Sequence, residues 1–378
     1  MRPPPDVLSA RLSRARTLLS ERQLDAVLVT GLPNIRYLTG FDGTTAVAVV
    51  TDQRPTLVVD GRYAAAVEAW RSETPGEHEA LVRVGHSLDE TAATVVEETE
   101  CSRVGYEAAH VTVSRFRAIE RVLGSHASIE LVETEGLIES LRLRKDAHEQ
   151  GILREAARRL SAVMTGIMAD LRAGVREWDI ASRVEEGLRR VGFARPAFDT
   201  IVASGPNAAM PHYRAGQRAL APGDLVVLDF GGVYSGYCVD LTRTVSIGAP
   251  SARALQLFSA VAAAQKAAFE AVRGGVLPQA VDAAARGVLA ERGLEAAFNH
   301  GTGHGLGLEV HEAPRLGPRA MAAVEPSEPL QPGMVITIEP GAYVPGFGGV
   351  RIEDDVLVTD DGCEILTTAD RGLVVVAT

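Results

Sequence analysis

Cysteine and long apolar runs are both scarce in this sequence. The three cysteines, Cys101, Cys238 and Cys363, are scattered and form no CxxC pair, so we expect neither a disulfide framework nor a thiolate metal site. No apolar run reaches the length of about 18 residues that a transmembrane helix needs. The N-terminal stretch MRPPPDVLSARLSRA lacks the apolar segment of a signal peptide. These absences predict a protein of the reducing cytoplasm without a membrane partner.

Clustered positive charge is also missing. Lysine and arginine number 38 against 49 acidic residues, which gives a net charge of -11. Binding to a nucleic-acid backbone needs clustered positive charge, so we expect no nucleic-acid partner. The sequence has no GxSxG element, which argues against a serine hydrolase. Its glycine-rich segment 301–307 lacks the GK[ST] ending of a nucleotide-binding loop.

The 378 residues are 46% hydrophobic, which suits a globular chain of two domains. Strands and helices alternate over the first part, and a turn is expected at 31–34. Strand-length apolar runs occupy 25–30, 45–50, 56–59, 103–106 and 129–132, and helices are predicted over 6–22, 62–71, 87–99 and 113–123. This alternation indicates a mixed α/β layer domain that ends near 141–148.

Helices of the second part come in two pairs. The spacing of apolar residues predicts helices over 149–171, 177–190, 252–273 and 278–292. Each pair precedes glycine-rich, strand-like sequence, at 198–247 and at 300–358. The order suggests a duplicated helix–helix–hairpin unit, although the residues themselves do not clearly repeat.

Four carboxylates stand at or near the ends of apolar strands. Asp229 ends the run LVVLD, and Asp240 follows after a glycine-rich turn that predicts a hairpin with both acids close together. Glu339 ends the run MVITIE, and Glu353 follows a turn expected within 341–349. A buried carboxylate without a partner costs several kcal/mol, so each needs a cation, a base or a proton. Neutralisation by Arg243 and Arg351 is one alternative.

Histidines favour a metal site instead. His300, His304 and His311 fall within twelve residues, and His212 stands just before the first hairpin. Four carboxylates and an imidazole suit Mn²⁺, Co²⁺, Zn²⁺ or Fe²⁺, and bridging carboxylates allow two ions. The chemistry indicated is hydrolysis without a covalent intermediate. We interpret the other histidines as surface or packing residues: His78, His86, His110, His126 and His148.

At these residues the sequence resembles the pita-bread metallopeptidases, the superfamily of methionine aminopeptidase, prolidase, aminopeptidase P and creatinase. The similar strings are GLPNIRYLTG, LDFGG, YCVDLTRT, HGTGHGLGLEVHEAP, TIEPG and GGVRIEDD. The resemblance implies an α/β (α+β) protein with a creatinase-like N-terminal domain over 1–143 and a pita-bread domain over 149–378. It also implies two divalent metal ions, with Mn²⁺ the first choice, and a homodimer.

The resemblance also assigns roles to particular residues. The implied metal ligands are Asp229, Asp240, His304, Glu339 and Glu353, with Asp240 and Glu353 bridging. His212 and His311 match the catalytic histidines, Glu339 is expected to move the proton, and His300 lies near the site. Arg315 resembles the group that binds a dipeptide's carboxylate, and the alternative is a solvated loop arginine. Arg351 is expected to shape the site or contact the substrate.

The activity these features predict is that of an Xaa-Pro dipeptidase acting on small peptides with proline in second position, through a hydroxide held between two metal ions. The close alternative is aminopeptidase P, which acts on longer peptides. A non-catalytic peptide-binding module is a third possibility, but such a module should have lost ligands that are all present here. Creatinase lacks the complete metal set, and methionine aminopeptidase normally lacks the N-terminal domain. The preferred residue before proline and a lid role for 317–332 stay open.

Overall fold

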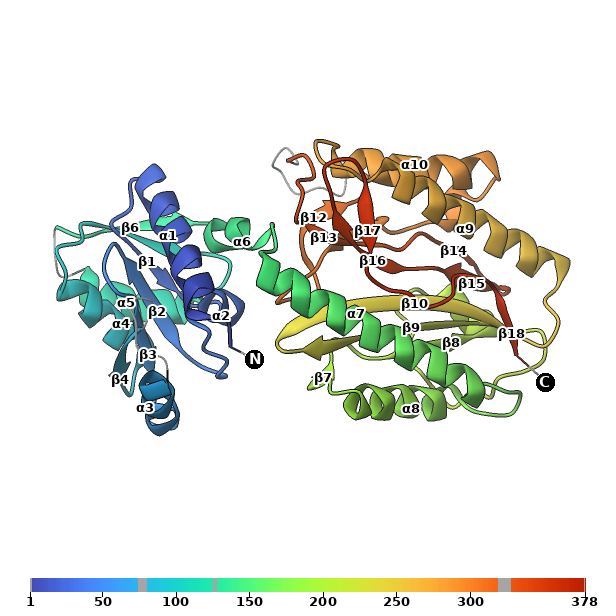
Figure 1. The fold of residues 1–378 in the computed structure, drawn as a ribbon, viewed down its shortest axis with the longest axis horizontal. Helices are drawn as coiled ribbons and strands as arrows, with labels where there is room; N and C mark the ends of the chain where they lie inside the picture. Colours follow the sequence, from blue (N-terminus) through green and yellow to red (C-terminus); the bar gives the residue numbers. More distant parts are fainter. Residues whose placement is uncertain (1, 74–79, 125–127, 319–327, 377) are drawn as a thin grey trace. The chain divides into compact units, whose positions relative to one another are not determined.

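The chain folds as two compact units, Met1–Arg142 and Leu143–Thr378 (Figure 1). The computed structural model describes residues 2–73, 80–124, 128–318, 328–376 and 378. Residues 319–327, which make up much of the segment considered as a lid, lie outside the described residues, as do His78 and His126.

The first unit is built on a six-stranded mixed sheet. Its central strand β1 (Ala26–Val29) pairs antiparallel with β2 and parallel with β5. The sheet order is β4 (Leu81–Val84), β3 (Thr56–Val59), β2 (Val47–Thr51), β1, β5 (Arg103–Glu107) and β6 (Glu130–Thr134). The helices are α1 (Pro5–Glu21), α2 (Leu32–Thr39), α3 (Ala64–Glu73), α4 (Leu88–Glu97), α5 (Val113–Leu123) and α6 (Leu137–Arg142). Helices α4 and α5 share an apolar core with the sheet.

Helix α2 replaces the turn expected at 31–34, so that expectation was wrong. Pro33 lies in the first turn of the helix, where its missing N–H would have no partner and its fixed φ suits the helix. Gly40 ends the helix with a φ of 73°, which favours glycine. Strand β4 and helix α6 were not predicted at all.

The first half of the second unit packs two helices on an antiparallel hairpin. Helix α7 (Ala147–Ile167) begins with a capping box formed by Asp146 and Glu149. Helix α8 (Glu177–Arg190) shares one apolar core with α7 and the hairpin strands. The sheet order is β18 (Val374–Val376), β10 (Tyr237–Ile247), β9 (Leu225–Tyr234) and β7 (Arg195–Pro196), with β8 (Ile201–Ser204) also paired to β9.

The β9–β10 hairpin is as the sequence predicts, and its turn is tight. Ser235 and Gly236 both have positive φ, at 48° and 86°. A two-residue turn in which both φ angles are positive matches the right-handed twist of the flanking strands. Nearly every residue of both strands is buried.

The second half repeats the order of a helix pair and a hairpin. Helices α9 (Ala252–Ala271) and α10 (Pro278–Glu291) share a core with β13–β16, and Figure 1 shows them along the orange edge of this unit. The sheet order is β12 (Glu312–Leu316), β11 (Gly303–Gly305), β13 (Val335–Ile338), β16 (Asp354–Val358) and β17 (Cys363–Ile365). Strands β14 (Gly341–Val344) and β15 (Gly348–Arg351) form a separate ladder.

The second hairpin is therefore not the single hairpin that the sequence suggests. Strand β13 pairs with β16, and β14 pairs with β15, so residues 339–340 and 352–353 stand between the two ladders. Pro340 falls in this break and has no N–H to donate. Gly341 belongs to β14 rather than to the turn, which covers residues 345–347. On one side of the break Ile338 pairs with Asp354, and on the other Gly341 pairs with Arg351. This register places Glu339 opposite Glu353.

We predict that Gly303→Ala destabilises the second unit by about 1–3 kcal/mol, the usual effect of overpacking. A Cβ at Gly303 would lie 2.0 Å from the backbone oxygen of Thr337, which would push β11 away from β13. Calorimetric melting of the metal-free protein measures the change. Gly287→Ala is the control because a Cβ there meets nothing within 4 Å, and it should add about 1 kcal/mol of helix stability. Equal melting temperatures for both variants would contradict the prediction.

Candidate metal centre

One cavity of about 840 Å³ in the second unit is lined by every residue that the sequence analysis placed in the site. The residues come from strands β9, β10, β11, β12 and β15, from the break between the split ladders, and from loops. They are Asp229, Asp240, His304, Glu339, Glu353, His212, His300, His311, Arg315 and Arg351.

The first two acids share one face of the β9–β10 hairpin. Asp229 lies opposite Thr242, and Asp240 lies opposite Gly231. Residues two apart on a strand point to the same side, so the two carboxylates are diagonal neighbours. Both are buried, with 7% and 5% of their surfaces exposed.

Asp240, His304 and Glu353 form the tightest part of the cluster. Each offers one ligand atom, and these atoms lie within 4.8 Å of one another. Nδ1 of His304 is 2.9 Å from the backbone oxygen of Gly305, so an Nδ1–H donates there and leaves the lone pair of Nε2 free for the cluster. Oε1 of Glu339 is 3.4 Å from this Nε2. Four groups thus converge, two from strands β10 and β11 and two from the break between the ladders.

Two of these carboxylates have an oxygen without a partner. Oδ1 of Asp229 and Oε1 of Glu353 are buried and accept no hydrogen bond within the described parts of the chain. Leaving such an oxygen unpaired costs one to several kcal/mol. Carboxylate oxygens and one imidazole nitrogen are ligands that first-row divalent cations accept. The donor set therefore fits a divalent metal centre.

The acids are held in protonation states that a cation would change. Burial, and then the charges of Asp229, Asp355 and Glu339, raise the pKa of Asp240 well above its ordinary value. Burial and the neighbouring carboxylates likewise raise the pKa of Glu353. Burial raises the pKa of Glu339 to about 7, against the opposing charge of Arg351. Without a cation, the cluster is too negative for all of its carboxylates to ionise at neutral pH.

The arginines neutralise only part of this charge. Nη2 of Arg351 donates to Oδ2 of Asp229, and its Nη1 donates to the Tyr343 hydroxyl at 2.7 Å. Arg243 pairs instead with Asp354, which lies outside the predicted ligand set. Within the described residues, no arginine or lysine forms an ion pair with Asp240 or Glu353. The alternative in which arginines alone balance the acids therefore fails for these two.

His212, His311 and Arg315 also line the cavity. His212 follows the short helix at Gly205–Ala209, and the ring of His311 lies 4.4 Å from that of His304 between centroids. Desolvation and then the charge of Arg315 lower the pKa of His311. Arg315 lies opposite His304 across β11 and β12. It is exposed, and it makes no ion pair or hydrogen bond with the described residues.

His300 is tied to the wall rather than to the cluster. Its Nε2 is 2.8 Å from the Tyr343 hydroxyl, and its Nδ1 is 2.8 Å from the oxygen of Gly301. Burial and the charge of Arg351 lower its pKa to about 3, so the ring is neutral at pH 7.

Sequence reasoning missed several supporting groups. Oγ1 of Thr242 donates to Oε2 of Glu353 at 2.6 Å, and Oδ2 of Asp355 accepts the N–H of Asp240 at 3.0 Å. Thr242 was detectable because it shares a strand face with Asp240. Lys145 forms a buried ion pair of 3.1 Å with Glu312 and so anchors the start of β12 beside His311. No sequence pattern connects these two distant residues.

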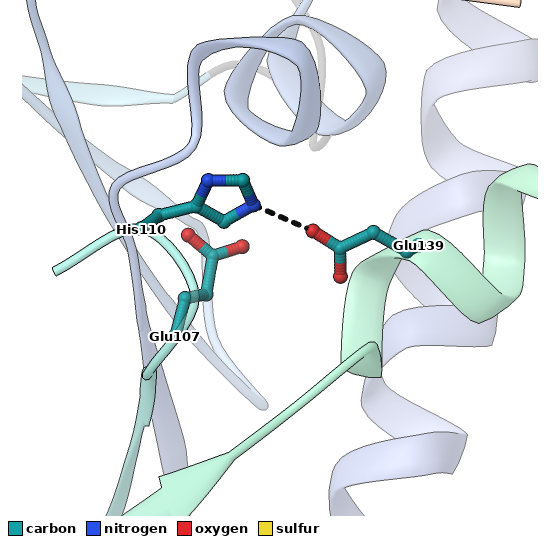
Figure 2. A group of neighbouring side chains, drawn as sticks. All are labelled: Glu107, His110 and Glu139. Carbon is teal, nitrogen blue, oxygen red and sulfur yellow. Dashed lines mark hydrogen bonds and ion pairs between the residues drawn. The ribbon is translucent and has the colours of Figure 1, made fainter. Parts of the chain in front are cut away.

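A second group of acids and a histidine lies in the first unit. Figure 2 shows His110 above Glu107, with Nε2 of the ring 2.8 Å from Oε1 of Glu139. Glu107 already accepts the N–H groups of Thr30 and Gly31 at the start of α2, at 2.6 and 2.7 Å. The amide of Asn34 donates to both glutamates at 2.6 Å. Since donors occupy these oxygens, we interpret the group as an anchor for α2 and not as a metal site.

The two units match two protein families. Residues 151–360 match the family described as Metallopeptidase family M24, and residues 11–144 match the Creatinase/Prolidase N-terminal domain. The fold and the site thus define a pita-bread metallopeptidase. This chain belongs to metallopeptidase family M24. Within the described residues, no helix is long and apolar enough to cross a membrane.

Individual relatives align along nearly the whole chain. A structure named Xaa-Pro dipeptidase from Bacillus anthracis is 36% identical with a TM-score of 0.89, over 97% of this chain and 99% of that one. A structure named X-Pro aminopeptidase from Thermotoga maritima is 33% identical with a TM-score of 0.86, over 97% and 99%. The Xaa-Pro dipeptidase of Pyrococcus horikoshii is 32% identical over 372 residues, which are 98% of this chain and 100% of the relative.

We predict that Glu339→Gln stabilises the metal-free protein at neutral pH. The folded state holds the Glu339 proton up to about pH 7, whereas the ordinary pKa is 4.5. Rising pH between these values removes the proton only from the unfolded chain, so the wild type loses stability there and the glutamine variant does not. Melting temperatures of chelator-treated proteins should be equal near about pH 4 and should diverge by about pH 7.

Glu364→Gln serves as the control with the opposite sign. Its hydrogen bond from Arg154 lowers the pKa of Glu364, so that variant should be the less stable one at neutral pH. A difference between Glu339→Gln and wild type that does not change with pH would contradict the assignment.

Proposed function

We propose that this chain hydrolyses the Xaa-Pro bond of dipeptides with two divalent metal ions. The observation that carries the proposal is the placement of Arg315. A guanidinium that forms no hydrogen bond or ion pair with the described residues lines the same cavity as five metal-ligand candidates. The planar guanidinium binds a carboxylate through two hydrogen bonds. A guanidinium in that position would suit the free C-terminal carboxylate of a short peptide that ends at proline.

The proposed metal ligands divide into two overlapping sets. Asp229 and Asp240 would hold one ion; Asp240, His304, Glu339 and Glu353 would hold the other, and Asp240 and Glu353 would be shared by both. Paired divalent ions supply an activated water and polarise the scissile carbonyl. The unpartnered oxygens of Asp229 and Glu353 support this division because both are buried and available as ligands.

The remaining groups act on the substrate and on the proton. Glu339, whose Oε1 lies 3.4 Å from Nε2 of His304, would move the proton between the attacking water and the leaving amine. His212 and His311 steady the substrate and the developing oxyanion from the cavity wall. Arg351 fixes Asp229 by a hydrogen bond and shapes the site, while His300 supports Tyr343.

An Xaa-Pro aminopeptidase is the second candidate, and the Thermotoga maritima structure carries such a name at 33% identity. Its substrates continue beyond proline, so no free carboxylate would lie beside the proline ring. Arg315 would then lack the ionic partner that the dipeptidase assignment gives it. The relatives named Xaa-Pro dipeptidase and the unpartnered guanidinium together favour the dipeptidase.

Four further properties belong to the proposal. Residues 1–143 form the creatinase-like domain, and 149–378 form the catalytic domain. The metal is Mn²⁺, with Co²⁺, Zn²⁺ and Fe²⁺ as alternatives. The protein is a homodimer of the cytoplasm, as the family resemblance implies. Light scattering after gel filtration tests the dimer, and elemental analysis of protein purified without added metal tests the ion.

We predict that Mn²⁺-loaded protein cleaves Ala-Pro and leaves Ala-Pro-Ala nearly uncut, and that a chelator abolishes cleavage. Preference for the tripeptide would establish the aminopeptidase instead. Glu353→Ala should lose both metal uptake and activity because it removes a bridging ligand. Glu291→Ala, at an exposed position on α10, is the control and should behave as wild type. Full turnover by reconstituted Glu353→Ala would refute the ligand assignment.

We also predict that Arg315→Ala raises KM for Ala-Pro by about 10- to 100-fold, the loss expected when a charged hydrogen-bond partner of the substrate is removed. KM for longer peptides should change little because their carboxylates lie elsewhere. Steady-state kinetics on both substrates gives the comparison, with Arg292→Ala as a surface control. An equal rise in KM for dipeptides and longer peptides would remove the specificity argument.

A further inference from the structure

Gln265 is a buried polar residue on the inner side of helix α9, which is otherwise apolar there. Its Nε2 lies 3.2 Å from the backbone oxygen of Ile338 and 3.1 Å from that of Ile352. It also lies 2.9 Å from Oδ2 of Asp354. An amide nitrogen has two hydrogens, so the three oxygens share them.

The two backbone oxygens belong to the residues just before Glu339 and Glu353. These are the positions where the β13–β16 ladder stops and the β14–β15 ladder has not begun. Ile338 still pairs with Asp354 in the β13–β16 ladder. Ile352 donates its N–H to the oxygen of Pro340 at 3.4 Å, but Pro340 has no N–H to return, so the buried oxygen of Ile352 needs another donor. The amide of Gln265 therefore donates to the backbone oxygen that precedes Glu339 and to the one that precedes Glu353.

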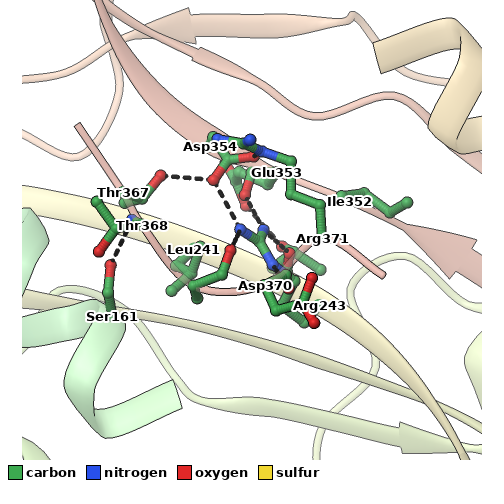
Figure 3. A network of polar contacts seen from close by, with 12 residues as sticks. Ser161, Leu241, Arg243, Ile352, Glu353, Asp354, Thr367, Thr368, Asp370 and Arg371 are labelled. Atoms are coloured by element: carbon green, nitrogen blue, oxygen red, sulfur yellow. Dashed lines mark hydrogen bonds and ion pairs between the residues drawn. The ribbon is translucent and has the colours of Figure 1, made fainter. Parts of the chain in front are cut away.

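Asp354 fixes the orientation of this amide. Its Oδ1 accepts from Nη2 of Arg243 and from Oγ1 of Thr367, both at 2.7 Å. Its Oδ2 accepts from Nε of Arg371 at 2.7 Å as well as from Gln265. Figure 3 shows the two arginines approaching Asp354 together with Thr367. The carboxylate already accepts from Arg243, Thr367 and Arg371, and a carboxylate oxygen can only accept. The NH₂ side of Gln265 must therefore face it.

The backbone of Glu353 is thus held from two directions. Nη1 of Arg243, on β10, donates to the oxygen of Glu353 at 2.5 Å (Figure 3). The same nitrogen donates to the oxygen of Thr242 at 2.8 Å. Gln265, on α9, donates to the oxygen of the preceding residue. Among the described hydrogen bonds, Arg243 makes none to Glu339. Gln265, by contrast, contacts the backbone of the residues that precede both glutamates.

We infer that Gln265 is a positioning residue for the metal centre, and that it sets the spacing between Glu339 and Glu353. The inference rests on the proposed function, in which both glutamates bind the same ion. Gln265 does not line the cavity and touches no ligand side chain. It acts through the backbone, by holding together two strand segments whose carboxylates repel each other. Residues that support ligands in this way typically change metal affinity by about 10- to 100-fold.

The test is the Mn²⁺ affinity of chelator-treated Gln265→Met, measured by isothermal titration calorimetry. Methionine keeps the length and bulk of the side chain but removes both donors. The dissociation constant should rise at least about 10-fold, and kcat for Ala-Pro should fall at limiting Mn²⁺. KM for Ala-Pro at saturating Mn²⁺ should stay near the wild-type value because the substrate contacts remain. Gln256→Met, at an exposed position on the same helix, is the matched control and should bind Mn²⁺ as wild type does.

Gln265→Asn is the second variant, because it keeps the amide but is one methylene too short to reach both breaks. This variant should also weaken Mn²⁺ binding. If Gln265→Met fails to fold, the dissociation constant of Gln265→Asn alone tests the inference. A dissociation constant within about twofold of wild type in the variants that fold overturns the inference. Failure of the wild-type protein itself to bind Mn²⁺ would refute the proposed function instead, so the two failures are distinguishable.

Discussion

Repulsion between buried carboxylates is the constraint on which the catalytic unit depends. Four acids converge in one cavity, and burial holds the pKa values of Asp240 and Glu353 well above their ordinary range. Such a cluster persists only if surrounding structure opposes the repulsion. The hairpin ladder, Arg351 and the polar group around Asp354 all do this (Figure 3). The two apolar cores beneath the sheets provide the free energy that keeps these elements in place.

The sequence predicts which residues meet in one cavity better than it predicts the strands that carry them. Asp229 and Asp240 could be placed on one hairpin because apolar runs flank a short glycine-containing turn, and local spacing decides hairpin formation. The second hairpin is split because Pro340 cannot donate to a ladder, an effect that competes with the strand propensity of MVITIE. Likewise, Pro33 favours the start of a helix as much as a turn, and the sequence alone does not decide between them.

Contacts between distant segments are what the sequence could not supply. Nothing in the string IEDD distinguishes Glu353, which lines the cavity, from Asp354, which faces Arg243 and Arg371. The difference arises from the alternation of side chains where β16 begins. Gln265 stands among alanines in a long helix, and its function follows only from the two strand breaks beside it. Lys145 and Glu312 meet over 167 positions of chain, which no local pattern encodes.

The sequence separation between the two hairpins also has a consequence for the order in which the site is assembled. Thr242 and its hydrogen-bonded partner Glu353 are 111 positions apart, so ribosomes complete β9 and β10 long before Glu353 exists. Domains fold as units once their residues are available, and a metal site that folding assembles has little affinity before then. The half-made chain presents Asp229 and Asp240 without their later partners. A metal centre that uses residues of both hairpins would therefore form only after the second unit has been completed.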